Sequence, residues 1–226
     1  MTKLRTFQTT EELIFQCLKT LRQVLPTLGT SDGVMLAGGR TPLEIYRRAA
    51  VEGISTKGKL FLSDERCVPV TDPHSNYGTI SPLFNVGQAS CLSGQAGSLS
   101  YFIKVKTELP IEKAARAFDA DLNQLINIPL GLLGLGADGH TASLFNLKDT
   151  ALRDGRFAIP VIKAEKPDRI SVTPALLYRI EKIILLATGA EKKAIIQTLL
   201  KKPDTIPAGV ALADHPNVEI WTDQVI

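Results

Sequence analysis

Short, uninterrupted apolar runs alternate along this chain with segments whose apolar residues recur at helical spacing. Helical patterns cover residues 9–25, 111–127 and 191–200, and another helix starts near residue 41. The apolar runs are residues 33–37, 59–63, 130–135, 183–187 and 218–221. Continuous rather than alternating apolar strands are typical of sheets covered on both faces. The sequence therefore predicts an α/β fold, with a mostly parallel sheet and helices on both faces.

Two helix starts carry capping signals. Thr9 and Glu12 have the spacing of a capping box, so the first helix is expected to begin directly after Thr9. Thr41 and Pro42, with Glu44 behind them, predict a second helix that has Thr41 as its N-cap. A further short helix is expected to begin within residues 140–145. The first strand is expected near Val34.

Residues 66–100 are rich in Pro, Ser, Gly and Asn and show no sustained period, which predicts a loop with at most short elements. A connection of this length inside a compact domain is typically functional, or it conceals an element. No repeat, linker or low-complexity tract interrupts the chain. Residues 1–226 are therefore expected to form a single domain.

The composition limits the kinds of molecule that the chain is expected to bind. The chain has 226 residues, of which 44% are hydrophobic and 22% charged, and this excludes a disordered, collagen-like or coiled-coil protein. A formal net charge of +3 is far below what a nucleic-acid-binding surface needs, but it suits a small anionic ligand. No apolar stretch approaches the ~20 residues of a membrane span. We expect neither nucleic acid nor membrane as a partner.

Cysteine usage indicates a reducing compartment. Cys17, Cys67 and Cys91 are odd in number and have neither CxxC nor metal-finger spacing. Cys17 lies on the apolar face of the first predicted helix and is expected in the core. The first residues lack the apolar run of a signal peptide. A cytoplasmic location is expected.

The loops that follow the strands are the places to look for a site, because ligands of open α/β sheets bind beyond the carboxyl ends of the strands. Gly38 and Gly39 separate a strand from a helix, where glycine lets the backbone approach a ligand and free N–H groups favour an anion. A tight turn that needs glycine for geometry alone is equally compatible with this pair. Asp64, Glu65 and Arg66 end the next strand. As an isolated triplet, they suit a solvated charged turn better than a site.

Residues 134–143 carry Asp138 and His140 at the tip of a glycine-rich turn. The segment matches GxGxxG, but these two side chains occupy the place where a dinucleotide pyrophosphate needs neutral backbone, so we reject a dinucleotide site. A histidine there suits acid–base chemistry, although a capping or core-edge histidine is the alternative. His74 and His215 lie in Pro-flanked loops and are expected at the surface.

Three further points concern chemistry. Lys192 falls in the first turn of a helix, where the macrodipole disfavours a cation by roughly 0.3–1 kcal/mol and a bound phosphate would compensate. Asp64, Asp138 and His140 could form a metal-ligand set, but Asp-x-His alone is weak evidence for one. A serine nucleophile is not expected, because no G-x-S-x-G elbow occurs.

Taken together, these blocks resemble the 6-phosphogluconolactonase family. The two specific blocks are residues 63–69, Ser-Asp-Glu-Arg-Cys-Val-Pro, and residues 134–145, which contain Asp-Gly-His-Thr-Ala-Ser-Leu-Phe. Residues 37–42, 72–77, 169–173, 188–192 and 218–223 follow in the family's order. The resemblance implies the fold shared by glucosamine-6-phosphate deaminase and ribose-5-phosphate isomerase. It also implies no cofactor and no metal.

The resemblance further implies hydrolysis of 6-phospho-D-glucono-1,5-lactone by water, the second step of the oxidative pentose phosphate pathway. His140 would be the general base, Asp138 would orient it, and Arg66 would stabilise the oxyanion or grip the substrate. Asp64 would lie in the site with its role open. The residues expected to bind the substrate and its phosphate are Gly38, Gly39, Arg40, Thr41, Lys192 and Arg169.

One departure from the family pattern concerns phosphate binding. The family's glycine block usually reads Ser-Gly-Gly-Ser-Thr-Pro, whereas Ala37 and Arg40 replace the two serines here. A charge-assisted hydrogen bond from arginine is stronger than one from a neutral hydroxyl. We therefore hypothesise that Arg40 is a phosphate ligand peculiar to this chain.

Two alternatives stay open at this point. A glucosamine-6-phosphate deaminase would carry tyrosine after the Asp-Glu pair and an acidic residue a few positions after the histidine. Here Arg66 follows the pair, and Ser143, Leu144 and Phe145 follow the histidine block. Non-catalytic sugar-phosphate sensors with this fold carry an N-terminal DNA-binding module, but a first strand near Val34 leaves room for one helix only. The presence of His140 also favours an enzyme.

Overall fold

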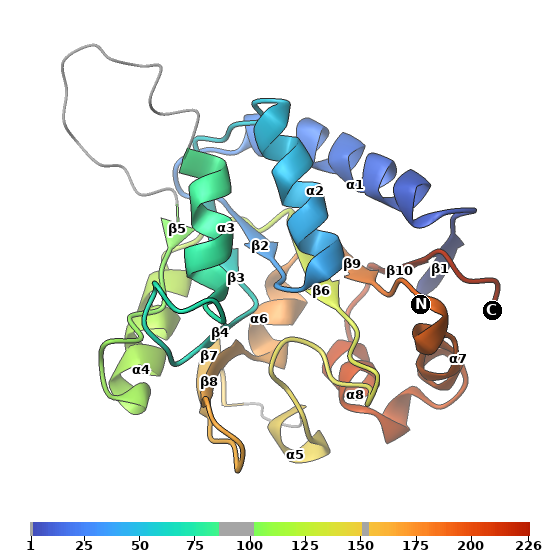
Figure 1. Ribbon diagram of the computed structural model, residues 1–226. Coiled ribbons are helices and arrows are strands. Elements are labelled where there is room, and N and C mark those ends of the chain that lie inside the picture. The colour runs from blue at the N-terminus through green and yellow to red at the C-terminus, as the bar shows by residue number, and fades with distance from the viewer. Residues whose placement is uncertain (1, 86–101, 151–153) are drawn as a thin grey trace.

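The computed structural model describes residues 2–85, 102–150 and 154–226, so Cys91 and the second half of the 66–100 segment lie outside the described residues. Seven parallel strands form the main sheet (Figure 1). In spatial order they are β1 (Lys3–Thr6), β10 (Val218–Thr222), β9 (Ile183–Leu186), β6 (Leu130–Gly134), β2 (Gly33–Leu36), β3 (Lys59–Leu62) and β5 (Phe102–Ile103). The predicted parallel sheet is confirmed.

A smaller antiparallel sheet continues from the carboxyl end of β3. Its order is β4 (Asp64–Arg66), β8 (Arg169–Val172) and β7 (Ala158–Val161). Because β4 follows β3 after a single residue, the chain passes directly from one sheet into the other. The Asp-Glu-Arg triplet is therefore a paired strand, and its interpretation as a solvated turn is wrong.

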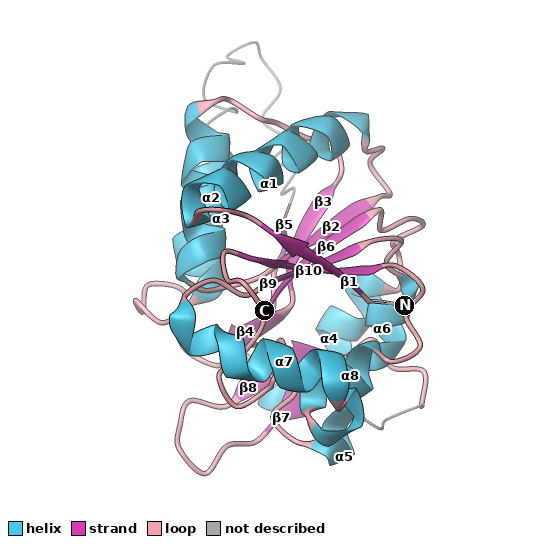
Figure 2. Cartoon of the chain, turned by 90° about the vertical axis from the view of Figure 1, so that its right-hand side faces the viewer, coloured by secondary structure: helices cyan, strands magenta, loops and turns pink. Residues whose placement is uncertain are grey.

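Helices cover both faces of the main sheet, as Figure 2 shows. One face carries α1 (Thr10–Val24), α2 (Arg40–Val51) and α3 (Asn76–Asn85). The other carries α4 (Ile111–Leu122), α6 (Pro174–Arg179), α7 (Lys193–Lys201) and α8 (Pro207–Leu212). The short α5 (Leu147–Thr150) and three 3₁₀ turns, η1 (Leu25–Thr27), η3 (Ala190–Lys192) and η4 (Pro203–Thr205), complete the described elements.

Each face of the sheet has its own apolar core, because successive strand residues point to opposite sides. In β2, Leu36 packs with the cluster that contains Ile45 and Tyr46 of α2. Its neighbour Met35 packs with the opposite cluster, which contains Phe118 of α4. All five of these side chains are buried. This two-sided burial explains why the strands are continuous apolar runs in the sequence.

The cap of the first helix is as predicted and that of the second is not. The Thr9 hydroxyl accepts a hydrogen bond of 3.1 Å from the Glu12 backbone N–H, and α1 begins at Thr10. The N-cap of α2 is Gly39 instead of Thr41, because Gly39 turns the chain with a φ of 106° two residues earlier. The hydroxyl of Thr41 lies 2.7 Å from that of Thr188.

Two other predictions are wrong for reasons of local chemistry. Residues 140–145 form no helix: Ala142 has a φ of 49°, Thr141 bridges to Leu144, and α5 begins only at Leu147. The first strand is β1, ahead of Val34. All four of its residues are exposed on the edge of the sheet, so they carry no apolar signal.

The 66–100 segment conceals a helix. Helix α3 contains Pro82 and Gly78, which hide the helical pattern. Its start is stabilised from outside the helix, because the carboxylate of Glu65 accepts hydrogen bonds from the backbone N–H groups of Asn76 and Tyr77. A cap that comes from a distant residue cannot be recognised in the local sequence.

Candidate active site

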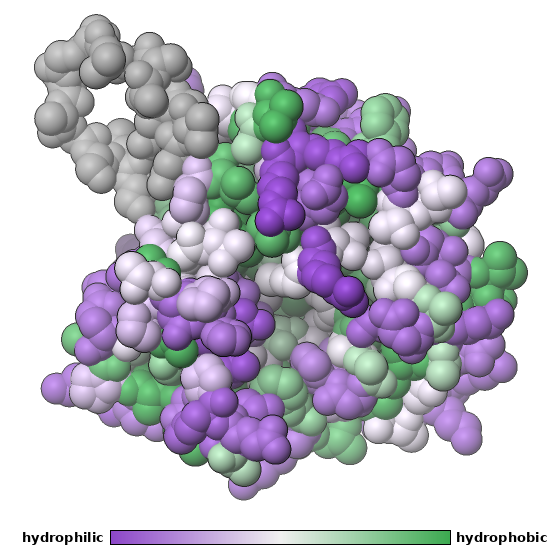
Figure 3. Space-filling view, viewed as in Figure 1, coloured by the Kyte–Doolittle hydropathy of each residue, from purple (hydrophilic) through white to green (hydrophobic). Residues whose placement is uncertain are grey.

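A cavity of about 400 Å³ lies beyond the carboxyl ends of β2, β3 and β6. Figure 3 shows a hollow near the centre of this face, with hydrophilic side chains beside it, in the region where α2 begins in Figure 1. The lining residues are Ala37, Gly38, Gly39, Ser63, Asp64, Arg66, Asn76, Gly134, Leu135, Gly136, His140, Ala142, Ser143, Phe145, Lys163 and Arg169. The sheet thus brings the three predicted strand-end loops to one place.

His140 and Asp138 form a bonded pair at the turn after β6. Nδ1 of His140 lies 2.5 Å from Oδ1 of Asp138, and the backbone N–H of His140 donates to the same oxygen at 3.3 Å. Partial burial raises the pKa of the Asp138 carboxyl, but the hydrogen bonds from His140 outweigh burial and the net pKa lies below its usual range. A Cβ on Gly136 would lie 2.2 Å from Nδ1, so the pair requires glycine at this position.

Phe145 borders the imidazole of His140, and Lys163 stands over Phe145. The ring centroids of His140 and Phe145 are 4.6 Å apart, and Nζ of Lys163 stands 3.7 Å from the Phe145 centroid. Lys163 belongs to the hairpin between β7 and β8, where its backbone N–H donates to the carboxylate of Asp168 at 2.9 Å. The hairpin therefore brings a cation to the wall of the cavity.

Asp64 connects the β3 end to the histidine turn. Its Oδ2 accepts a hydrogen bond of 2.6 Å from Ser143, and its Oδ1 accepts one of 3.0 Å from Ser63. Ser143 and Ser63 are both buried, so the carboxylate is held from two sides.

Two arginines face each other in the smaller sheet. Arg66 of β4 is paired directly with Arg169 of β8, and both line the cavity. Burial and the nearby charge of Arg66 lower the pKa of Arg169. Like charges directly opposite each other in a ladder are destabilising. An anion bound between them would remove that repulsion.

The glycine pair forms the wall next to α2. A Cβ on Gly38 would lie 2.5 Å from Oδ1 of Asn76, and Gly39 has the positive φ noted above, so each glycine has its own structural requirement. The preceding Ala37 is clamped by the hydroxyl of Tyr46, which bonds its N–H at 3.0 Å and its carbonyl at 3.1 Å. No side chain caps α2, so its first N–H groups remain available to an anion.

The remaining predicted residues lie around this wall. Lys192 donates from Nζ to the carbonyl of Leu135 at 2.7 Å, and so reaches the backbone of a lining residue without lining the cavity itself. Thr41 is bonded to Thr188 at the end of β9. Arg40 is exposed, and its side chain is not among the lining groups.

The predicted site is therefore assembled in part. Gly38, Gly39, Asp64, Arg66, His140 and Arg169 line one cavity, and Asp138 joins it through His140. Arg40, Thr41 and Lys192 lie outside the lining. Other lining side chains had no role in the prediction, among them Ser63, Asn76, Ser143, Phe145 and Lys163. All of these except Lys163 lie within the sequence blocks that carry the family resemblance. The sequence therefore identified the blocks as important but did not indicate the roles of these residues.

The other histidines and the cysteines can be compared with expectation. The side chain of His74 is 74% exposed, as predicted, but His215 is buried, because its ring lies against the carbonyl of Ile180 at 2.6 Å. Cys17 is buried, as predicted, and burial raises its pKa to about 12. Among the described residues, no group of three or more His, Cys, Asp or Glu side chains is arranged to hold a metal ion. Within the same ranges, no helix has the length and apolar character needed to cross a membrane.

Comparison with known proteins decides the family. The model of the family described as "Glucosamine-6-phosphate isomerases/6-phosphogluconolactonase" matches residues 8–221. The chain belongs to this family. A 6-phosphogluconolactonase of Thermotoga maritima is 34% identical over 173 residues, which are 74% of each chain. One of Caulobacter vibrioides is 33% identical over 207 residues, which are 86% of each.

Solved structures of the family share the fold. The T. maritima 6-phosphogluconolactonase structure has a TM-score of 0.80 at 26% identity and covers 98% of this chain and 99% of its own. A 6-phosphogluconolactonase from Shewanella baltica has a TM-score of 0.83 at 21% identity, with 98% of each chain covered. A monomeric glucosamine-6-phosphate deaminase has a TM-score of 0.78 at 19% identity, covers 98% of this chain and 97% of its own, and shares the fold alone. The expected fold class is confirmed.

Proposed function

We propose that this chain is a 6-phosphogluconolactonase, which hydrolyses 6-phospho-D-glucono-1,5-lactone to 6-phospho-D-gluconate in the oxidative pentose phosphate pathway. The observation that carries the proposal is the bonded His140–Asp138 pair, set in one cavity with Arg66 and Arg169. The named relatives support it. Because residues from Ala37 to Arg169 line one cavity, we propose that residues 1–226 form a single domain.

The chemistry requires a base and an electrophilic pocket. With Nδ1 of His140 engaged by the Asp138 carboxylate, Nε2 is the basic nitrogen that takes a proton from water. The water oxygen forms a bond to the lactone carbonyl carbon, and the oxygen that becomes negative is stabilised by Arg66 or Arg169. The bond from that carbon to the ring oxygen then breaks. His140 returns its proton to the ring oxygen, which becomes a hydroxyl, while the new carboxylic acid ionises in water.

The phosphate anchors the far end of the substrate in this proposal. The N–H groups of Gly38, Gly39, Arg40 and Thr41 surround the uncapped start of α2, which favours a dianion. Lys192 and the exposed Arg40 side chain would add positive charge from outside the cavity lining. Anchoring the remote phosphate also orients the lactone carbonyl toward His140. Arg40→Ser with an unchanged KM would reject the part assigned to that side chain.

Two alternative activities are weaker. The deaminase shares the fold and the family description, but Arg66 follows the Asp-Glu pair where that enzyme is expected to have tyrosine. A non-catalytic binder would not need a histidine held by a carboxylate. A cytoplasmic location remains part of the proposal and is supported by the cysteine usage described above.

The deciding experiment is lactone hydrolysis on freshly made substrate. Glucose-6-phosphate and its dehydrogenase generate the lactone, 6-phosphogluconate dehydrogenase detects the acid, and the spontaneous rate is subtracted. We expect a protein-dependent rate that chelator leaves unchanged. A rate equal to the blank would overturn the proposal, and ammonia release from glucosamine-6-phosphate would then point to the deaminase.

A further inference from the structure

Neighbouring residues set the orientation of the Arg66 guanidinium. Its Nη1 donates to the carbonyl of His74 at 2.7 Å and to Oδ1 of Asn76 at 2.8 Å. Two acceptors on a single nitrogen fix the plane of a guanidinium, because its five donors are held in a rigid fork. Its Nε is buried and has no hydrogen-bond partner among the described residues. The guanidinium is thus held from the side of residues 74–76.

The Asn76 side chain contacts three residues that line the cavity: Arg66 and Asp64 of β4, and Gly38 before α2. Besides Arg66, it donates from Nδ2 to the carbonyl of Asp64 at 3.0 Å. Its side chain also lies so close to Gly38 that a Cβ there would clash with the amide. The side chain is buried and lines the cavity. One amide therefore relates the glycine turn, the carboxylate-bearing strand and the arginine to one another.

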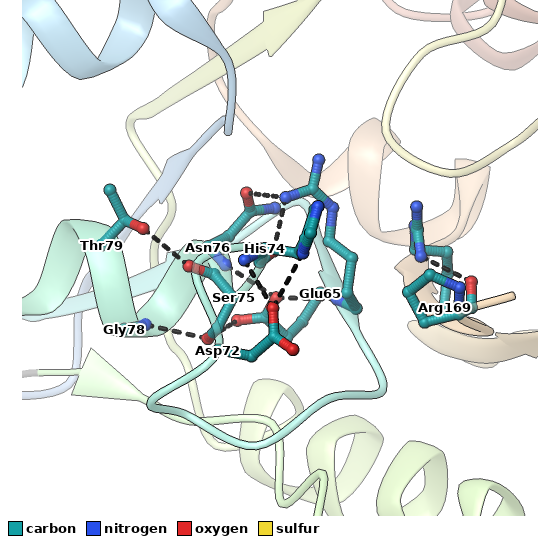
Figure 4. Close-up of polar contacts among 10 residues, drawn as sticks. Glu65, Asp72, His74, Ser75, Asn76, Gly78, Thr79 and Arg169 are labelled. Atoms are coloured by element: carbon teal, nitrogen blue, oxygen red, sulfur yellow. Dashed lines mark hydrogen bonds and ion pairs between the residues drawn. The ribbon is translucent and has the colours of Figure 1, made fainter.

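Asn76 is in turn held by Glu65. The buried carboxylate accepts hydrogen bonds from the backbone N–H groups of Arg66 at 2.7 Å, Asn76 at 2.9 Å and Tyr77 at 2.6 Å. A fourth, longer bond of 3.3 Å comes from the Ser75 hydroxyl. Figure 4 shows Glu65, Ser75 and Asn76 gathered together, with Arg169 across from them. Because β4 alternates, Glu65 points away from the cavity while Asp64 and Arg66 point toward it.

We propose that Asn76, backed by Glu65, is a positioning residue for lactone hydrolysis: it sets the Arg66 guanidinium relative to Asp64 and the Gly38 backbone. The inference rests on the proposed function, because it takes Arg66 to stabilise the reacting carbonyl. It accounts for residues 72–77, which the family resemblance included but to which no role was attached.

A double-mutant cycle tests whether Asn76 acts through Arg66. Asn76→Ala should lower kcat/KM for the lactone by roughly 10- to 100-fold, since a displacement of about 1 Å in a site can cost 10²-fold. In an Arg66→Ala background the same change should cost less than about threefold. Thr79→Ala is the matched control, because it removes a hydrogen bond to the Ser75 carbonyl in the same helix without touching Arg66. A full additional loss in the double variant, or Asn76→Ala within about twofold of wild type, would overturn the inference.

A second measurement separates this inference from the proposed function. The Nε–Hε resonance of Arg66, assigned by its absence in Arg66→Lys, should shift or broaden in Asn76→Ala and Glu65→Gln and stay in place in Thr79→Ala. If the wild type is inactive but the Arg66 resonance shifts in Asn76→Ala, the lactonase function is rejected, whereas the positioning of Arg66 by Asn76 stands. If the wild type is active and the Arg66 resonance in Asn76→Ala is the same as in the wild type, only the positioning is rejected. Circular dichroism melting identifies any variant that fails to fold. If Asn76→Ala is such a variant, Asn76→Ser replaces it in both experiments.

Discussion

Ser143 donates a hydrogen bond of 2.6 Å to the carboxylate of Asp64, although 79 residues separate them in the chain. This bond connects the two sequence blocks on which the family resemblance chiefly rested. It also leaves the carboxylate in one orientation, because Ser63 holds the other oxygen.

Ser143→Ala should therefore disturb Asp64 without removing it. A hydrogen bond to a charged group contributes about 1.5–3 kcal/mol, so we expect kcat/KM to fall by roughly tenfold or more. Ser63→Ala, which removes the longer bond, should cost less. Steady-state kinetics on the lactone measure both, and equal activity in Ser143→Ala and wild type would mean that the orientation of Asp64 is irrelevant to the reaction.

His140→Ala removes the proposed base. The rate above the spontaneous background should drop by about 10²–10⁴-fold, the usual contribution of a positioned general base. Asp138→Asn should cost less, because the imidazole stays in place but loses the carboxylate that holds Nδ1. The coupled lactone assay distinguishes the two, and near wild-type turnover by His140→Ala would end the mechanism proposed here.

Gly39→Ala should impair both folding and binding. Gly39 has a φ of 106° and a ψ of 168°, a region that is essentially restricted to glycine, so the substitution should destabilise the fold by about 1–3 kcal/mol. We also expect a raised KM, since the residue lies at the uncapped start of α2. Gly53→Ala is the matched control: it has a φ of 67°, open space around it and no place in the cavity. Denaturant titration should show a loss for both variants, whereas a KM change in Gly53→Ala would contradict the argument.

Lys163→Met should weaken substrate binding more than catalysis. Its ammonium stands over Phe145 at the cavity wall and would attract an anionic sugar phosphate, an effect we put at about two- to fivefold in KM from the ~0.5–1 kcal/mol of an exposed charge interaction. Lys148→Met, a change of the same kind on α5 outside the cavity lining, should leave KM unchanged. A fall in kcat with constant KM would instead give Lys163 a part in the chemical step.

His215 should make stability depend on pH. Burial lowers its pKa below the usual 6.5, against the opposing effect of the hydrogen bond to the Ile180 carbonyl. Below about pH 6.5 the unfolded chain takes up a proton that the folded chain refuses, so the free energy of unfolding falls as the pH drops. Above that pH the imidazole is neutral in both states, so this loss of stability is absent. Urea titrations at pH 7.5 and 5.5 should show a larger drop for wild type than for His215→Gln, and equal drops would contradict this account.

The sequence predicted well whatever depends on a regular pattern. Strands β2, β3, β6, β9 and β10 are buried on both faces, so their apolar runs were visible, and the strand-end rule then located Gly38, Asp64 and His140. Elements without an apolar signal were missed. The residues of β1 are all exposed, and those of β4 are all charged. The start of helix α3 depends on the carboxylate of Glu65, which lies eleven residues before Asn76, the first residue of the helix.

The missed side chains share one cause. Asn76 and Ser143 act on Arg66 and Asp64 across gaps of 10 and 79 residues, and only the sheet crossing brings such partners together. Lys163 had no detectable signal, because one lysine in a polar hairpin looks like any surface lysine. Residue types could therefore suggest the reacting groups, whereas the groups that hold them required coordinates.

The order of strands in the main sheet also bears on how the protein is made. Strand β10 lies between β1 and β9, and in Figure 1 it runs beside β1, although ribosomal synthesis reaches β10 after every other described strand. The earliest strand must therefore wait unpaired until this last one inserts next to it. The single tryptophan, Trp221, lies buried in β10 against the ring of Phe7, with Arg5 of β1 over it. Its fluorescence should consequently report the closing event of folding, the moment when the two ends of the described chain meet.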